Sequence, residues 1–279
     1  MILTLNAVAF LAVLAAIFVP LERLFPAHRQ RVRRAEWGTD LLFFLGQQLL
    51  WTAPVVAVLV AVHERVDALP LGGLRDAIAA LPLGVQLVGA ILISDLCIYW
   101  AHRLSHSVPL LWRFHRVHHT APRLDWLAAY REHPLDNVYT RLVENLPLLV
   151  LGTPLHLLAG FMIFRGLWAV YIHSNVAWTP GRLAVLVGSS RLHHWHHEPE
   201  VGGRVNFTNL SPLMDKLFGT YHDPGRMPER YGLAAEDDVP HGYVRQLADP
   251  FIDPFRGSLV STPRARNRRS ALRLRPARR

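Results

Sequence analysis

Residues 83–106 read LGVQLVGAILISDLCIYWAHRLSH and join an apolar run of helix length to a pair of histidines. Such a run is long enough to cross most of a bilayer. A spacing of four places His102 and His106 on one helix face, one turn apart. Asp95 and Tyr99 lie on the same face, and we expect them to hold the second ring nitrogens of these histidines. The stretch predicts a membrane helix that ends in two metal ligands; the alternative is an interfacial histidine pair without metal.

Two further histidine clusters follow this stretch. Residues 115–119 read HRVHH, and residues 193–197 read HHWHH. Offsets of three and four residues place neighbouring histidines on either side of one helix face, so that one can serve one metal ion and its neighbour another. The alternative is a histidine-rich soluble helix that binds nothing. Nine of the sixteen histidines fall in these three clusters, which favours the metal interpretation.

The ligand type narrows the class of site. Neutral imidazole suits iron, zinc and copper, and this many imidazoles exceeds the needs of one ion and matches two. Carboxylates are nearly absent from the clusters, which argues against the Glu/His di-iron site of soluble helical bundles. The motif His-Glu-x-x-His does not occur, so a zinc peptidase would lack its base.

Apolar residues make up 51% of the 279-residue chain and are gathered into blocks. Residues 2–25 and 40–62 are each long enough to cross a bilayer, and Pro54 is expected to kink the second span. Residues 142–172 are broken at Gly152-Thr153-Pro154, and each half is shorter than a full span, so we expect a helical hairpin there. The prediction is an all-α integral membrane bundle, with three full spans plus a helical hairpin and a cytosolic, histidine-rich metal-binding cap.

The charge of the chain is concentrated at its C-terminal end. Net charge is +9, and residues 256–279 contain nine arginines and no acid. This tail is expected to be disordered, either solvated or attached to an anionic membrane face. Nucleic-acid binding is disfavoured because no aromatic residues are interleaved. The single cysteine, Cys97, excludes an internal disulfide and a CxxC pair.

Arginine is in excess in the loops after the first and third spans. The positive-inside rule then places the N-terminus outside and the metal site on the cytoplasmic side. We therefore expect a multi-pass protein of a bacterial inner membrane or an ER-like membrane.

The ordered set HxxxH, HxxHH and HxxHH resembles the fatty acid hydroxylase / sterol desaturase superfamily. Glu132-His133-Pro134, His173-Ser174-Asn175 and residues 206–220 resemble it as well. With this resemblance the chain divides into four parts. They are an N-terminal transmembrane region (1–83), a fatty acid hydroxylase-like di-metal domain (84–225), a C-terminal cap segment (226–255) and the Arg-rich tail (256–279).

The resemblance implies two iron ions, O2 as co-substrate, and hydroxylation or desaturation of a C–H bond in a fatty acyl, sterol or related lipid. Zinc cannot supply this chemistry, because it has no redox activity. The implied metal ligands are His102, His106, His115, His118, His119, His133, His173, His193, His196 and His197. The residues expected to support these ligands are Asp95, Tyr99, Asn175 and His194.

The electrons are expected to come from a partner. The chain contains no Gly-rich dinucleotide fingerprint and no obvious fused haem domain, so we expect an external reductase, ferredoxin or cytochrome. The alternative function is a membrane metal- or haem-binding protein without oxygenase activity. A metal transporter would place ionisable ligands inside its spans, whereas the clusters here lie at span ends and in the polar segments.

Overall fold

The computed structural model describes residues 2–201, 203–234 and 239–252. Within these residues every regular element is a helix, and the one isolated β-bridge pairs Pro26 with Val176. The all-α prediction is confirmed. The Arg-rich tail expected at residues 256–279 lies outside the described residues.

Within the described residues, four helical stretches are long and apolar enough to cross a membrane: Thr4–Leu24, Trp37–Asp67, Leu83–Ser107 and Leu155–His173. They belong to α1 (Ile2–Leu24), to α2 (Trp37–Gly46) with α3 (Thr52–Asp67), to α5 (Leu83–Ser107) and to α8 (Leu155–His173). Many of their large apolar side chains are exposed, as expected of surfaces that face lipid.

The second span is interrupted close to its proline. A π-helical turn, Gln47–Trp51, joins α2 to α3, and Pro54 follows three residues later. Proline has no amide hydrogen for the carbonyl four residues earlier, so the regular α-helical pattern cannot continue through Leu50. The Thr52 hydroxyl donates to the Gln47 carbonyl at 2.7 Å and closes the wider turn.

The fourth apolar block forms two helices, α7 (Pro134–Val150) and α8, joined by a turn at Gly152 and Thr153. Gly152 has φ +80°, which glycine adopts without strain, so the predicted break is confirmed. The expectation that each half is shorter than a span is wrong for α8. Its 19 residues rise about 28 Å, close to the thickness of a bilayer core.

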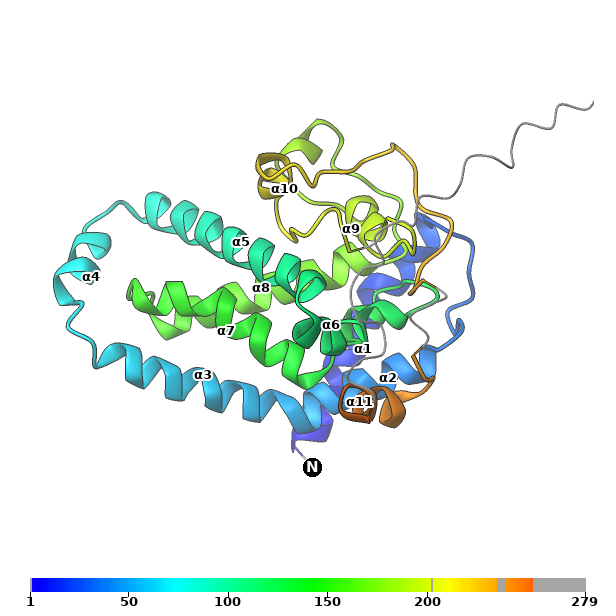
Figure 1. Ribbon diagram of the computed structural model, residues 1–279, viewed down its shortest axis with the longest axis horizontal. Helices are drawn as coiled ribbons and strands as arrows, with labels where there is room; N and C mark the ends of the chain where they lie inside the picture. The colour runs from blue at the N-terminus through cyan, green and yellow to red at the C-terminus, as the bar shows by residue number, and fades with distance from the viewer. Residues whose placement is uncertain (1, 202, 235–238, 253–279) are drawn as a thin grey trace, which may run out of the picture.

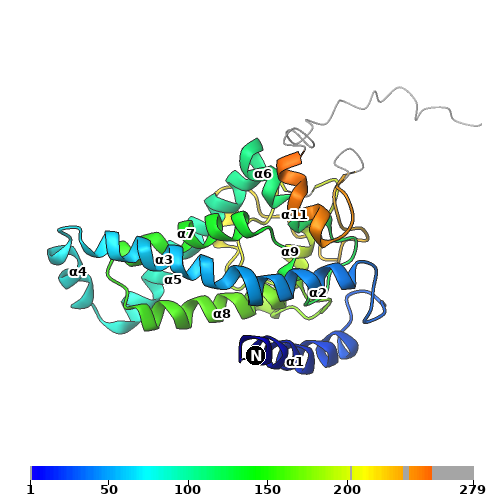
Figure 2. The same cartoon turned by 90° about the horizontal axis from the view of Figure 1, so that it is seen from below.

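Helices α3, α5, α7 and α8 lie alongside one another, and α1 crosses them at an angle (Figures 1 and 2). Helix α4 (Gly72–Ala79) joins α3 to α5 at one end of this bundle, where the Arg75 side chain donates to the Val150 carbonyl before the α7–α8 turn. The remaining elements gather at the other end (Figure 1). They are α6 (Pro109–His115), α9 (Ser190–His196), α10 (Leu213–Leu217), α11 (Tyr243–Ile252) and the short turns His118–Thr120, Ala128–Tyr130 and Gly181–Val185.

A buried arginine ties three of the long helices together. Arg165 of α8 lies 2.8 Å from Asp95 of α5 and 2.6 Å from Glu144 of α7. All three side chains are buried. A charge inside a membrane protein is tolerated when it is paired in this way, and leaving it unpaired is costly.

Candidate metal centre

Nine histidines converge at the end of the bundle opposite α4. One group contains His102, His106, His115, His119 and His196, and the other contains His118, His173, His193 and His197. Within each group, one ligand nitrogen of every ring lies within 4.8 Å of the others. Each HxxHH box contributes histidines to both groups, as the offsets of three and four residues predict. The structure thus brings together nine of the ten histidines that the sequence predicts as ligands.

Helix ends position these rings. The last two turns of α5 carry His102 and His106, and α8 ends at His173. Helix α6 starts with Pro109 in its first turn, where the missing amide costs nothing, and ends at His115. Helix α9 carries the third box and is capped by the hydroxyl of Ser189, which accepts from the Leu192 amide.

Backbone carbonyls fix the orientation of four rings through Nδ1. These contacts join His102 to Phe207 at 2.7 Å, His118 to Arg131 at 3.0 Å, His173 to Ala169 at 2.7 Å and His196 to Val205 at 2.8 Å. A carbonyl oxygen only accepts, so each Nδ1 carries a hydrogen and each Nε2 keeps a lone pair. The Nε2 atoms of these four rings are therefore free to bind metal.

These lone pairs face one another. The Nε2 of His173 lies 2.9 Å from that of His118 and 2.9 Å from that of His193. The Nε2 of His106 lies 3.2 Å from that of His196. His118 and His173 both carry their ring hydrogen on Nδ1, so their two Nε2 lone pairs repel at 2.9 Å unless a cation lies between them. This donor set of neutral imidazoles fits first-row metal ions.

Unpartnered nitrogens support the same interpretation. The Nε2 atoms of His102, His115 and His119 are buried and have no hydrogen-bond partner among the described residues. A buried polar atom without a partner is costly and calls for an explanation such as an ion. All three belong to the five-histidine group, which also contains the facing pair of His106 and His196.

Burial keeps the rings neutral. It lowers the pKa of His118, His119, His193 and His197 well below the usual value, and that of His196 to about 3. Repulsion between neighbouring imidazolium charges acts in the same direction for each of these rings. The rings are thus in the neutral form that binds metal.

The structure does not bring His133 into either group. Its Nδ1 accepts from the Leu135 amide at 3.1 Å and caps α7, and its Nε2 donates to the Leu247 carbonyl at 3.2 Å. Both ring nitrogens are therefore used within the protein.

For three of the expected supporting residues, the hydrogen bonds go to groups other than the predicted ligands. Asp95 lies seven residues before His102, about 10 Å along the helix axis, and pairs with Arg165 instead. The Tyr99 hydroxyl accepts from Arg103 at 2.7 Å and lies 3.1 Å from the Thr220 hydroxyl.

The Asn175 side chain hydrogen-bonds the backbone of His28. His194 is the one expected supporting residue that contacts a predicted ligand. Its Nε2 lies 3.2 Å from the His173 carbonyl.

The sequence reasoning missed Asp136. Its carboxylate accepts from Nδ1 of His115 at 2.8 Å. A carboxylate behind a metal-binding histidine fixes the tautomer and raises the basicity of the other nitrogen. A signal was present, because Pro134 and an acid in the first turn mark the start of a helix directly after His133.

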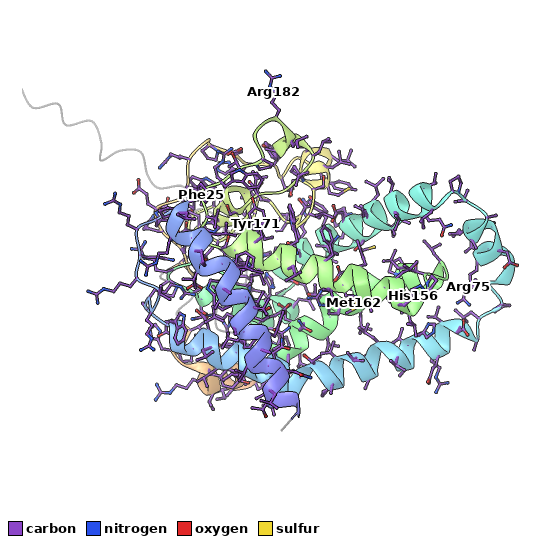
Figure 3. The ribbon with its side chains drawn as sticks, turned by 180° about the vertical axis from the view of Figure 1, so that it is seen from behind. Phe25, Arg75, His156, Met162, Tyr171 and Arg182 are labelled. Atoms are coloured by element: carbon purple, nitrogen blue, oxygen red, sulfur yellow. The ribbon has the colours of Figure 1, made fainter. Side chains whose placement is uncertain are left out.

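A cavity of about 550 Å³ reaches both groups, with His102 and His173 among its lining residues. Its apolar side is formed by residues of α1 and α8, including Val13 and Ile163, whose side chains are also exposed on the molecule. The segments that follow these two helices pair with each other, because the Phe25 carbonyl accepts from the Ala177 amide (Figure 3 labels Phe25 and Tyr171). The arrangement admits an apolar chain from the membrane to the histidines.

Comparison with known proteins gives a family match. Residues 87–220 match the family model described as fatty acid hydroxylase. The chain is similar to ornithine lipid hydroxylase OlsE of Rhizobium tropici, with 33% identity over 180 residues that cover 64% of this chain and 54% of the relative. It is also similar to Delta(7)-sterol 5(6)-desaturase ERG3A of Gibberella zeae, with 26% identity over 213 residues that cover 74% of this chain and 58% of the relative.

Human alkylglycerol monooxygenase is 30% identical over 133 residues, which cover 46% of this chain and 28% of that protein. The chain thus spans little more than half the length of the first curated relatives that it matches. No solved structure matches the chain.

Proposed function

The chain belongs to the fatty acid hydroxylase / sterol desaturase superfamily, and from this premise we propose that it is an O2-dependent di-iron enzyme that hydroxylates or desaturates a membrane lipid. The observation that carries the proposal is the pair of histidine groups at the end of a lipid-facing cavity. Two groups of four and five imidazoles match two ions. The nearly carboxylate-free donor set matches the histidine boxes of this family.

We propose the nine grouped histidines as the iron ligands and leave His133 out of the set. Iron in these groups would supply the redox chemistry that O2 activation requires. The protein's own residues have other tasks. Backbone carbonyls and Asp136 hold the rings in one tautomer, and burial excludes water from the lone pairs.

The proposed substrate is a lipid whose chain enters between α1 and α8. Relatives are named for ornithine lipid, sterol and alkylglycerol. We propose an ornithine lipid as the first substrate to test, since that relative has the highest identity of the three. The cavity wall supports an amphiphile over a plain hydrocarbon, because Glu132 and Arg141 line it beside the apolar residues.

Lipid mass spectrometry tests the proposal. The chain is expressed in a bacterium that makes ornithine lipids, and its lipids are compared with those of cells carrying His118→Ala or His196→Ala at equal abundance. We expect a new lipid that is heavier by one oxygen atom or lighter by two hydrogens, present only with the unaltered chain. A metal- or haem-binding protein without oxygenase activity would load metal and leave the lipids unchanged.

We further propose that the metal centre faces the cytoplasm and that α4 faces the exterior. Helix α4 lies at the end of the bundle opposite the histidines (Figure 1), and the arginine asymmetry of the loops gives the direction. Reporter fusions at Leu74 and after Arg256 should report opposite compartments. The same compartment for both would refute this topology.

A further inference from the structure

A basic pocket lies just beyond the end of α1. It has a volume of about 320 Å³, and Arg23, Arg29, Arg31 and the half-buried His28 are among its lining residues. The three arginines are exposed. Glu22 is the one acid among the described residues that line the pocket, and two backbone amides hydrogen-bond one of its oxygens. The pocket therefore presents net positive charge to a partner.

A chain of hydrogen bonds leads from this pocket to the metal centre. The Nε2 of His28 lies 2.9 Å from the Tyr231 hydroxyl, which lies 2.8 Å from Nδ1 of His194. The Nε2 of His194 in turn lies 3.2 Å from the carbonyl of His173. Tyr231 and His194 are both buried, so the chain runs through the protein interior.

The acceptor at the end of this chain of hydrogen bonds fixes the direction of every bond in it. The His173 carbonyl can only accept, so Nε2 of His194 carries the hydrogen and Nδ1 accepts. The Tyr231 hydroxyl must then donate to His194, and its oxygen accepts from Nε2 of His28. Every member has one consistent role, so the three side chains form an ordered path without a gap.

The pocket and the metal centre are also joined through the backbone. The segment that follows His173 pairs with the loop that follows α1, where the Ala27 amide donates to the Asn175 carbonyl at 3.0 Å. The Asn175 side chain holds both backbone groups of His28. His28 is therefore held in place by Asn175, which follows the proposed ligand His173 by two residues.

The proposed oxidation consumes electrons from outside: RH + O2 + 2 e⁻ + 2 H⁺ gives ROH + H2O. We propose, on the basis of that function, that the arginine pocket around His28 binds the acidic face of a one-electron carrier protein, and that His28, Tyr231 and His194 conduct its electrons to the histidine groups. Charge complementarity selects an acidic partner and speeds its docking. Anionic lipid headgroups would also suit the arginines, but they would make no use of a path that starts in the same pocket.

The test uses the iron-loaded full chain in lipid nanodiscs and a reduced plant-type [2Fe–2S] ferredoxin, which is an acidic one-electron carrier. Stopped-flow absorbance follows the oxidation of the ferredoxin, and calorimetry measures its binding to the metal-free chain. Arg29→Glu/Arg31→Glu should slow the bimolecular reaction by about tenfold or more and weaken binding, with the difference shrinking at high salt. Arg182→Glu is the control, since Arg182 is exposed, points outwards from the molecule (Figure 3) and is not among the residues that line the pocket.

Tyr231→Phe separates docking from conduction. It keeps the ring and removes the hydroxyl that joins the two histidines, so ferredoxin affinity should be unchanged while electron transfer at saturating ferredoxin slows severalfold. Equal rates of ferredoxin oxidation in the unaltered chain, the arginine variant and Arg182→Glu would overturn the proposed docking site. Rates unchanged by the arginine variant, together with weaker retention in anionic nanodiscs, would assign the pocket to lipid headgroups and also overturn it.

Dithionite distinguishes this inference from the proposed function. It is small and needs no docking site, so it should support lipid oxidation equally in all variants. Oxidation with dithionite but no reaction of the unaltered chain with ferredoxin would overturn the inference alone. No lipid product with either reductant, at full iron content, would overturn the proposed function.

Discussion

Nδ1 of His115 donates to Oδ2 of Asp136 at 2.8 Å, and both side chains are buried. Asp136 lies in the first turn of α7, whereas His115 ends α6. The contact therefore joins the second histidine box to one of the long helices. It also leaves the Nε2 of His115 as a lone pair that faces the five-histidine group.

Asp136→Asn should weaken iron binding or activity by about 10–100-fold, because the amide cannot fix the tautomer or raise the basicity of His115 as a carboxylate does. Metal analysis and lipid oxidation measure the effect. Asp67→Asn is the control, since Asp67 forms an exposed ion pair with Arg75. Equal iron content and activity in the two variants would show that Asp136 does not support a ligand.

Gly203→Ala should disturb the five-histidine group without touching the other. Gly203 has φ +71°, and an added Cβ would overlap the imidazole of His106. Gly219→Ala is the matched control, since Gly219 has φ +73° and nothing within 4 Å of an added Cβ. Both variants bear about 1–2 kcal/mol of left-handed strain, so a difference in iron content between them isolates the contact with His106. The same iron content in both would remove His106 from the proposed ligands.

The sequence predicted much of this site because helical periodicity is local. Offsets of three and four assign neighbouring histidines such as His118 and His119 to different groups without knowledge of the tertiary fold. The failures come from contacts between distant segments. Asp95 lies on the correct helix face, but Arg165 of α8 is within its reach and His102 is not. The partners of the Nδ1 atoms are mostly backbone carbonyls, which no residue type reveals.

The same limit applies to the membrane helices. Gly152 and Pro154 predicted the break between α7 and α8, because turn chemistry is local. The sequence did not indicate the interruption at Gln47–Trp51, although Pro54 marked its neighbourhood. His133 illustrates the reverse error. A histidine beside a proline at the start of a helix caps that helix, and its place near the other boxes in the sequence suggested a ligand.

His118→Ala and His196→Ala should each abolish lipid oxidation, because each removes a ring from a different group. Loss of a ligand should cost more than the 10–100-fold typical of a supporting residue. His241→Ala should retain nearly full activity, since its side chain is 79% exposed beside Glu36. Activity is compared at equal protein abundance, because lost metal can also destabilise the fold. An active His118→Ala variant with normal iron would remove that residue from the ligand set.

Arg165→Leu should destabilise the bundle by about 3–5 kcal/mol, because it leaves Asp95 buried without its counter-charge and leaves Glu144 paired with Arg141 alone. Thermal unfolding in mild detergent measures the loss. The triple variant Asp95→Asn/Glu144→Gln/Arg165→Leu should recover much of it, since both buried carboxylates become neutral amides. A triple variant as unstable as Arg165→Leu would show that the arginine contributes through packing and not through its charge.

Acid should destabilise the metal-free protein at a mild pH. Burial lowers the pKa of both His194 and His196 from 6.5 to about 3 in the folded state. Between these values the unfolded chain binds protons that the folded chain does not, so stability is fully present above pH 6.5 and is lost as the pH falls towards 3. Each such histidine contributes up to about 1.4 kcal/mol per pH unit in that window. Thermal unfolding from about pH 7.5 to about pH 5 measures the slope.

His194→Gln should reduce that slope by about one proton, because it removes a ring whose pKa burial lowers to about 3. Bound iron should raise the stability at every pH in this window and leave the slope nearly unchanged, because the folded rings carry no protons for the metal to displace. A flat profile in the metal-free protein would mean that the grouped rings accept protons in the folded state. The neutral, lone-pair-facing arrangement on which the proposed iron site depends would then be wrong.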